Sequence, residues 1–210
     1  MNIEIISKKR GRPAAFDYDT ALHQAMVAFW QYGYEGTSMA TLMSVMQMNK
    51  ASIYAAYGSK EALFKKAVEC YVQGPASFFA TSLAQANALD VVQSILTNAA
   101  TMLADPSHPA GCLVTHGALA CSDESREVKA LLGGYRDGLE QTLAQRLGTL
   151  MSAQQNSLVD SVVLAKLVMT VHQGMVVQAI SGATQIALMH VAEMATQLVS
   201  QSLQPQSLNV

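Results

Sequence analysis

One continuous stretch of the sequence decides the fold: YGYEGTSMATLMSVMQMNKASIYAAYGSKEALF, residues 32–64. Three apolar runs within or just after it each follow a residue that favours a helix N-cap, namely Ser38, Asn49 and Ser59. Gly33 and Gly58 stand where glycine ends a helix. With the helical periodicity before Gly33, these signals predict four short helices: one over about 19–32, one after Ser38, one over 50–57 and one after Ser59.

The second and third of these helices, joined by a tight turn, form a helix-turn-helix unit. The later helix of such a unit lies in the DNA major groove, which is about 12 Å wide. Short side chains near the start of helix 50–57 allow its backbone to approach the bases. Hydroxyls and lysines at helix N-termini suit phosphate binding. The predicted DNA contacts are Thr37, Ser38, Lys50, Ser52, Tyr54 and Lys60.

Three blocks, YGYEGTS at 32–38, NKASIY at 49–54 and YGSKEALF at 57–64, resemble the N-terminal domain of TetR-family repressors. The resemblance covers about residues 16–71 and keeps the order and spacing of the blocks. It implies an all-helical homodimer in which an effector domain controls the spacing of two DNA-reading heads.

Matching positions extend the resemblance to single residues. It implies that Thr37, Tyr54 and Lys60 bind phosphates, while Lys50 and Ser52 face the groove. Two departures stand beside these matches. Gln47 occupies a turn position where the family usually has glycine, and Ala55 occupies one that is often large or polar. A non-glycine residue in a left-handed turn costs about 1 kcal/mol, so we expect a slightly altered turn.

A basic arm, KKRGRP at residues 8–13, precedes the predicted head. Lys9, Arg10 and Arg12 suit a narrow A·T-rich minor groove. The alternative is a disordered tail that raises only non-specific affinity. Residues 1–70 carry a net charge of +2 and the remainder −4, within a total of −2. A basic head on an acidic body suits a protein that meets a polyanion at one end.

Composition narrows the class of protein. Half of the 210 residues are hydrophobic and 13% are charged, which indicates a packed globular chain. Strand-like alternation is absent, so the sequence predicts an all-α fold. No uninterrupted apolar run approaches the roughly 18 residues of a membrane span, and no signal peptide is recognisable. The three cysteines form no disulfide framework. We therefore expect a cytoplasmic protein without a membrane partner.

Gly74-Pro75 marks the predicted boundary between two domains. The expected organisation is a basic arm over 1–15, a helix-turn-helix DNA-binding domain over 16–73, and an effector-binding and dimerisation domain over 74–210. In the last domain we expect helices at about 88–104, 111–121, 123–151, 157–182 and 184–203.

Candidate sensor residues lie in two of these helices. Cys112 and His116 are four residues apart, so a helix would place them on one face, where they suit thiol chemistry or a soft metal. Cys112 also follows Gly111 near a predicted helix N-terminus, which stabilises a thiolate. The alternative is a buried structural cysteine. His172 and Gln173, in an otherwise apolar helix, suit either ligand anchors or a dimer seam.

The last two predicted helices provide the expected dimer surface. Small residues there permit close helix packing, and two helices from each subunit would form a four-helix bundle. The predicted interface residues are Leu164, Leu167, Val171, Met175, Ile186 and Met189.

The predicted function is a repressor that binds a palindromic double-stranded operator as a homodimer. A small-molecule, thiol-reactive or metal effector of unknown identity would release it. An enzyme using Cys112 and His116 lacks an orienting third group and an oxyanion hole, so we expect neither catalysis nor a cofactor. An architectural DNA binder without an effector, and an activator, remain alternatives.

Overall fold

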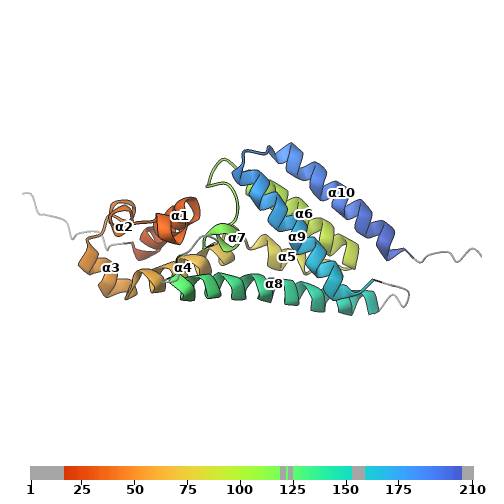
Figure 1. Cartoon of the computed structure of the whole chain (residues 1–210), viewed down its shortest axis with the longest axis horizontal. Helices are drawn as coiled ribbons and strands as arrows, with labels where there is room; N and C mark the ends of the chain where they lie inside the picture. The colour runs from red at the N-terminus through yellow and green to blue at the C-terminus, as the bar shows by residue number, and fades with distance from the viewer. Residues whose placement is uncertain (1–16, 119–121, 123–124, 153–158, 205–210) are drawn as a thin grey trace, which may run out of the picture.

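The computed structural model describes residues 17–118, 122, 125–152 and 159–204. Every regular element in this part of the chain is helical, which confirms the all-α prediction (Figure 1). The predicted arm residues Lys9, Arg10 and Arg12, together with Cys121, lie outside it. The helices are α1 (Tyr18–Gly36), α2 (Met39–Met46), α3 (Lys50–Tyr57), α4 (Lys60–Gln73), α5 (Phe78–Ser82), α6 (Ala88–Leu103), α7 (Leu113–His116), α8 (Arg126–Ser152), α9 (Ser161–Ile180) and α10 (Gln185–Leu203).

The predicted N-caps are confirmed atom by atom. The Ser38 hydroxyl accepts from the Thr41 N–H at 3.0 Å, Asn49 Oδ1 accepts from the Ser52 N–H at 2.8 Å, and the Ser59 hydroxyl accepts from the Ala62 N–H at 3.0 Å. Each bond satisfies one of the backbone donors that a helix start leaves free. These local contacts explain why α2, α3 and α4 begin where the sequence indicates.

Helix α1 continues beyond its predicted end at Tyr32. Gly33 departs from helical geometry, with φ 70° and ψ 175°, and the chain then turns again as far as Gly36. The Tyr34 N–H, freed by this kink, donates to the Gly117 carbonyl at 2.9 Å. A positive φ is accessible to glycine at little cost, so Gly33 permits both the kink and the distant contact.

The head, α1–α4, occupies one end of the molecule (Figure 1). The remaining helices form the body, and α8 starts close to α4 and runs along the body. In the body, α9 packs on α8, and α6 lies between α9 and α10. One apolar core runs through head and body, from Phe29 and Leu63 to Ile95 and Val176. The reading head and the body therefore share packed side chains.

In the segment between α4 and α8 one expectation was wrong and one helix was missed. The helix predicted over 111–121 spans only Leu113–His116, and α5 was not predicted at all. Gly111 has φ 87°, and a Cβ there would lie 2.6 Å from Ile180 Cγ1. With Gly111 at positive φ and Cys112 extended, at φ −133° and ψ 121°, neither residue is helical, so the helix begins only at Leu113.

Helix α9 is long and apolar enough to cross a membrane by length and composition, with a mean hydropathy of 1.4 over its best 18-residue window. In the fold, 44% of that window is buried, against α8, α6 and α10. The search for an uninterrupted apolar run therefore underestimated how apolar this helix is. A helix in a protein core can meet the same criteria of length and composition as one that crosses a membrane.

Candidate nucleic-acid interface and effector pocket

Helix α3 presents its polar side chains away from the body. Ile53 is buried and fixes the helix, while Tyr54 is 38% exposed and Lys50 is exposed. The Lys50 ammonium lies 5.7 Å from the centre of the Tyr54 ring, so the two side chains share one face. Ser52 is half-buried on the first turn. These residues occupy the position of a recognition helix.

The predicted phosphate contacts at the neighbouring helix starts differ in their exposure. Lys60 is half-buried, and its Nζ lies 4.3 Å from the centre of the Tyr34 ring, while Ser38 is exposed and caps α2. Thr37, by contrast, is fully buried, and its hydroxyl donates to the carbonyls of Gly33 at 2.7 Å and Ala28 at 3.2 Å. The predicted phosphate contact at Thr37 was therefore wrong, because this buried hydroxyl bonds to carbonyl groups of α1.

Gln47 ends α2 in the left-handed conformation, with φ 53° and ψ 38°, and its N–H bonds back to the Met43 and Ser44 carbonyls. This left-handed conformation costs a residue with a Cβ about 1 kcal/mol or more. We expect Gln47→Gly to raise the free energy of unfolding by about 1 kcal/mol, seen as a thermal midpoint roughly 2–4 °C higher. In the control, Gln141→Gly in the exposed middle of α8, stability should fall by about the same amount. A loss of stability in Gln47→Gly would contradict this account of the turn.

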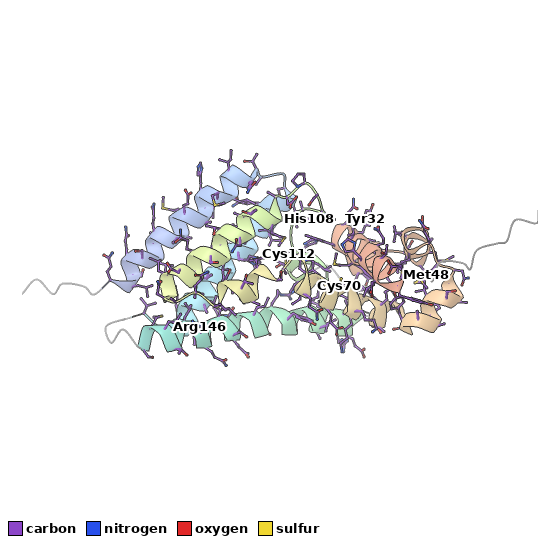
Figure 2. The ribbon with its side chains drawn as sticks, turned by 180° about the vertical axis from the view of Figure 1, so that it is seen from behind. Tyr32, Met48, Cys70, His108, Cys112 and Arg146 are labelled. Atoms are coloured by element: carbon purple, nitrogen blue, oxygen red, sulfur yellow. The ribbon has the colours of Figure 1, made fainter. Side chains whose placement is uncertain are left out.

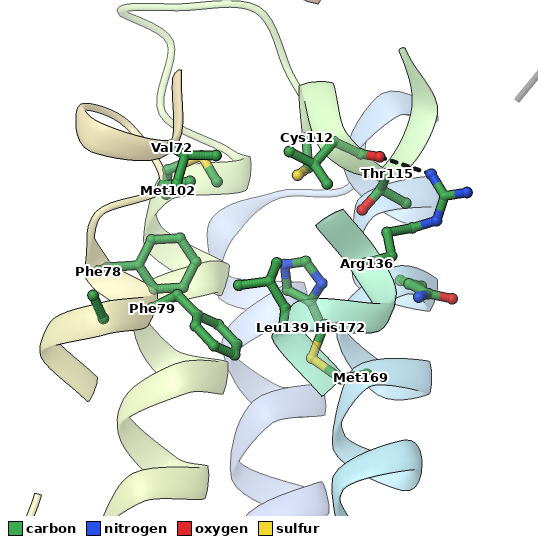
Figure 3. A pocket seen from close by; sticks show the side chains of 14 residues that line it. Val72, Phe78, Phe79, Met102, Cys112, Thr115, Arg136, Leu139, Met169 and His172 are labelled. Carbon is green, nitrogen blue, oxygen red and sulfur yellow. Dashed lines mark hydrogen bonds between the residues drawn. The ribbon is translucent and has the colours of Figure 1, made fainter. Parts of the chain in front are cut away.

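A pocket of about 100 Å³ lies where α4 to α9 meet (Figure 3). Its wall is mostly apolar, with side chains such as Val72, Phe78, Phe79, Met102, Leu139 and Met169. The predicted sensor residues Cys112, His172 and Gln173 all line it, together with Thr115 and Arg136, whereas His116 does not. The structure thus brings three of the four sensor candidates together.

His172 is the most perturbed group in this pocket. Burial lowers the pKa of its imidazole to about 4, so the ring is neutral at pH 7. Its Nδ1 is buried and has no hydrogen-bond partner among the described residues. An unsatisfied buried polar atom carries a free-energy cost, and such atoms in native proteins usually serve a purpose.

The segment around α7 faces the pocket on one side and α1 on the other. Cys112, Val114 and Thr115 line the pocket. His116 Nε2 lies 2.9 Å from the Trp30 carbonyl, and the Trp30 indole N–H donates to the Gly111 carbonyl at 3.1 Å. The expected pairing of Cys112 with His116 at one sensor site is therefore wrong, because the two side chains serve opposite sides of the segment.

Most of the contacts at the junction between head and body were not predicted from the sequence. Trp30, the only tryptophan, stacks on His108 at 4.3 Å and meets the edge of Tyr71 at 4.7 Å. Glu35 accepts hydrogen bonds from Ser122 and Ser125, and these bonds lower the pKa of its carboxyl. In Figure 2 the labelled His108 and Cys112 lie at this junction between head and body. The partners are 41 or more residues apart, and no local pattern predicts such pairs.

Cys112 itself is 5% exposed and precedes a helix of only four residues. So short a helix has little dipole, which removes the predicted stabilisation of a thiolate by a helix N-terminus. Within the described ranges no group of three or more His, Cys, Asp or Glu could hold a metal ion. The metal alternative at Cys112 and His116 thus gains no third ligand here.

The predicted dimer surface requires a correction. Leu164 and Met175 are buried in the subunit's own core, and Val171 and Met189 are half-buried. Leu167 and Ile186 are exposed, at 51% and 69%. The apolar residues that α9 and α10 leave open, here called the α9/α10 face, are Val162, Val163, Leu167, Val177, Ile180, Ile186, Met194 and Leu198.

Comparison with known proteins matches both the head and the whole chain. Residues 21–67 match the family model for bacterial regulatory proteins of the tetR family. The chain is 30% identical over 195 residues to the HTH-type transcriptional repressor ComR of Escherichia coli K12, covering 90% of this chain and 91% of that one. A cysteine mutant of the TetR family transcriptional regulator CifR, solved with a 26 bp double-strand operator DNA, is 33% identical with a TM-score of 0.83. That match covers 89% of this chain and 98% of CifR.

Proposed function

The chain belongs to the TetR family of bacterial regulatory proteins and is a DNA-binding transcriptional repressor; on this premise we propose that it acts as a homodimer whose operator affinity is controlled by a small molecule in the pocket beside α7. Its site of action is then the bacterial cytoplasm, with no membrane partner. The operator is a palindrome, because a two-fold dimer presents two equivalent heads.

One observation carries this proposal: the short segment 111–117 belongs to the pocket and to the head at once. Cys112, Val114 and Thr115 form part of the pocket wall, and the carbonyls of Gly111 and Gly117 accept hydrogen bonds from α1. A ligand that displaces the wall by a fraction of an ångström must also shift these bonds, because packed interiors transmit strain. Pocket occupancy and head position are therefore coupled.

The assembly is proposed from the α9/α10 face. Along α9, Val163, Leu167 and Val177 recur at helical spacing, and they are exposed in the isolated subunit. Ile186, Met194 and Leu198 extend the apolar surface across α10. Exposed apolar side chains gathered on two helices are typical of an interface, and the same face on a second copy completes a four-helix bundle.

The effector is proposed to act by filling the pocket. A thiol-reactive molecule is a second candidate on one specific observation, that Cys112 lines the pocket. An adduct on its sulfur would occupy the same space as a reversible ligand. Both therefore reach the head by the same route, through segment 111–117.

Operator binding tests the reading head. We expect Lys50→Ala to weaken operator binding by about 1–3 kcal/mol, roughly 5- to 150-fold, while binding to random duplex falls much less. The measurement is fluorescence anisotropy at fixed salt, with an operator selected from genomic fragments by the purified protein. The control is Lys129→Ala, an exposed lysine of α8. Equal losses on operator and random duplex would show that Lys50 contacts only phosphate.

A further inference from the structure

The pocket has one polar end that the proposed function leaves unexplained. Arg136, from α8, lines the pocket, and its Nη1 donates to the Val114 carbonyl at 2.9 Å (Figure 3). Within the described part of the chain Arg136 makes no ion pair, and no Asp or Glu lines the pocket. A guanidinium has five N–H donors, so donors remain beyond the bond to Val114.

His172 is the second polar group at this end. Figure 3 shows its ring within the pocket, with Leu139 and Met169 labelled beside it. The ring is 8% exposed, and its Nδ1 lacks a hydrogen-bond partner among the described residues. The other polar side chains of the pocket, Thr115, Arg136 and Gln173, make no hydrogen bond to this nitrogen, so a polar group on a ligand or an ordered water is needed to satisfy it.

From these two groups we propose that the pocket takes a small, otherwise apolar carboxylic acid, with its carboxylate bound by Arg136 and His172 and its hydrocarbon part against Phe78, Phe79 and Met102. The proposal deepens the proposed function and rests on it for the consequence of binding. A pocket of about 100 Å³ is smaller than a cavity of about 150 Å³ that holds benzene, so it admits a small aliphatic acid without rearrangement and an aromatic acid only if the wall moves.

Charge favours an acid over a neutral polar molecule. A cationic guanidinium without a carboxylate partner attracts an anion, and Arg pairs with a carboxylate through strong charge-assisted bonds. The titratable groups that line the pocket with His172 are Arg136 and the Cys112 thiol, while α4, α5 and α6 contribute apolar side chains. No acid thus competes with the ligand for the cation.

Binding of a carboxylate should also protonate His172. The free imidazole is held neutral by burial, and a carboxylate beside it stabilises the imidazolium. The pKa of His172 then rises on binding, so the complex takes up as much as one proton at a pH between about 4 and the raised pKa. Affinity for the carboxylate consequently increases as the pH falls below the raised pKa of the complex towards about 4, the pKa of the free imidazole. A residue with a merely structural role would produce no such uptake.

The test compares acids with neutral molecules of the same shape. Isobutyrate is paired with isobutyramide, and benzoate with benzamide, and each is titrated into the full-length protein. Binding is followed by imidazole 1H–15N spectra, and calorimetry in two buffers of different ionisation enthalpy counts the protons taken up. We expect at least one acid to bind about tenfold or more tightly than its amide, with proton uptake.

Two variants separate the polar end from the pocket as a whole. His172→Gln keeps a hydrogen-bonding group of similar size but cannot take up a proton in this range, so proton uptake should vanish and the preference for the acid should shrink. Gln141→Ala, on the exposed side of α8, leaves the pocket wall intact and should keep both. Circular dichroism establishes that each variant is folded.

Several outcomes overturn the proposal: amides that bind as tightly as acids, an acid preference that survives His172→Gln with the same proton uptake, or no binding by any probe. Operator binding is measured separately. If an acid binds as expected and the operator complex is unchanged, the ligand class stands and the control of DNA binding fails. If filling the pocket by other means releases DNA while acids bind no more tightly than their amides, the control of DNA binding stands and the ligand class fails.

Discussion

Leu167→Asp is expected to convert the repressor from a dimer to a monomer at micromolar concentration. Leu167 is 51% exposed and lies on the α9 side of the α9/α10 face, between Val163 and Val177. In a two-fold interface each substitution is counted twice, and an unpaired carboxylate in an apolar interface costs several kcal/mol. We therefore expect the dimer dissociation constant to rise by about 100-fold or more, measured by analytical ultracentrifugation.

Operator binding should fall with the dimer. One head reads only half of a palindrome, and loss of the linked second head removes an advantage of about 10²–10⁴ in affinity. Helix content should not change, because Leu167 is exposed within its own subunit. The control is Gln141→Asp on the exposed side of α8, which should leave both assembly and operator binding intact. A monomeric wild type at micromolar concentration would contradict the α9/α10 interface, as would a Leu167→Asp variant that stays dimeric.

The parts of the fold that were predicted correctly depend on local signals. Ser38, Asn49 and Ser59 cap helices because the hydroxyl or amide oxygen lies within three residues of the N–H it accepts from. The turn at Gln47 was indicated by the resemblance to a family that usually has glycine there, and its left-handed conformation is likewise local. Such contacts are visible in the sequence because both partners are adjacent in it.

The parts that were not predicted depend on which face of an element is covered. Helix α9 is apolar on nearly every side, so periodicity alone did not separate Leu164 and Met175, which its own subunit buries, from Leu167, which it leaves open. The position of Thr37 at a helix start predicts a phosphate contact, but its hydroxyl points inward to the Gly33 carbonyl. In both cases tertiary packing overrides a correct local pattern.

The path of segment 111–117 was not predicted, for a related reason. The helix expected over 111–121 would have placed Cys112 and His116 on one face, but the helix begins only after Cys112, whose own backbone is extended. The consequence is functional, because Cys112 is left facing the pocket while His116 bonds to α1. A two-sided segment of this kind follows from contacts with Trp30 and Ile180, which no local sequence pattern reveals.

The central claim, that an occupied pocket weakens DNA binding through segment 111–117, can be tested without knowing the effector. Cys112 lines the pocket, so a covalent group on its sulfur occupies the space that a ligand would take. Benzyl methanethiosulfonate suits the purpose: the thiolate attacks the sulfenyl sulfur, a mixed disulfide forms, and methanesulfinate leaves. The protein carries Cys70→Ser and Cys121→Ser, so that only Cys112 reacts.

The deciding measurement is the operator dissociation constant of this protein before and after labelling, with complete single labelling verified by intact mass. We expect the constant to rise by about 100-fold, near the upper end of ordinary allosteric coupling, and to return when dithiothreitol removes the benzylthio group. The same protein with Cys112→Ser should not respond to the reagent. Fully labelled protein that binds its operator as tightly as unlabelled protein would contradict the account, because the pocket would then be filled without any effect on the reading head.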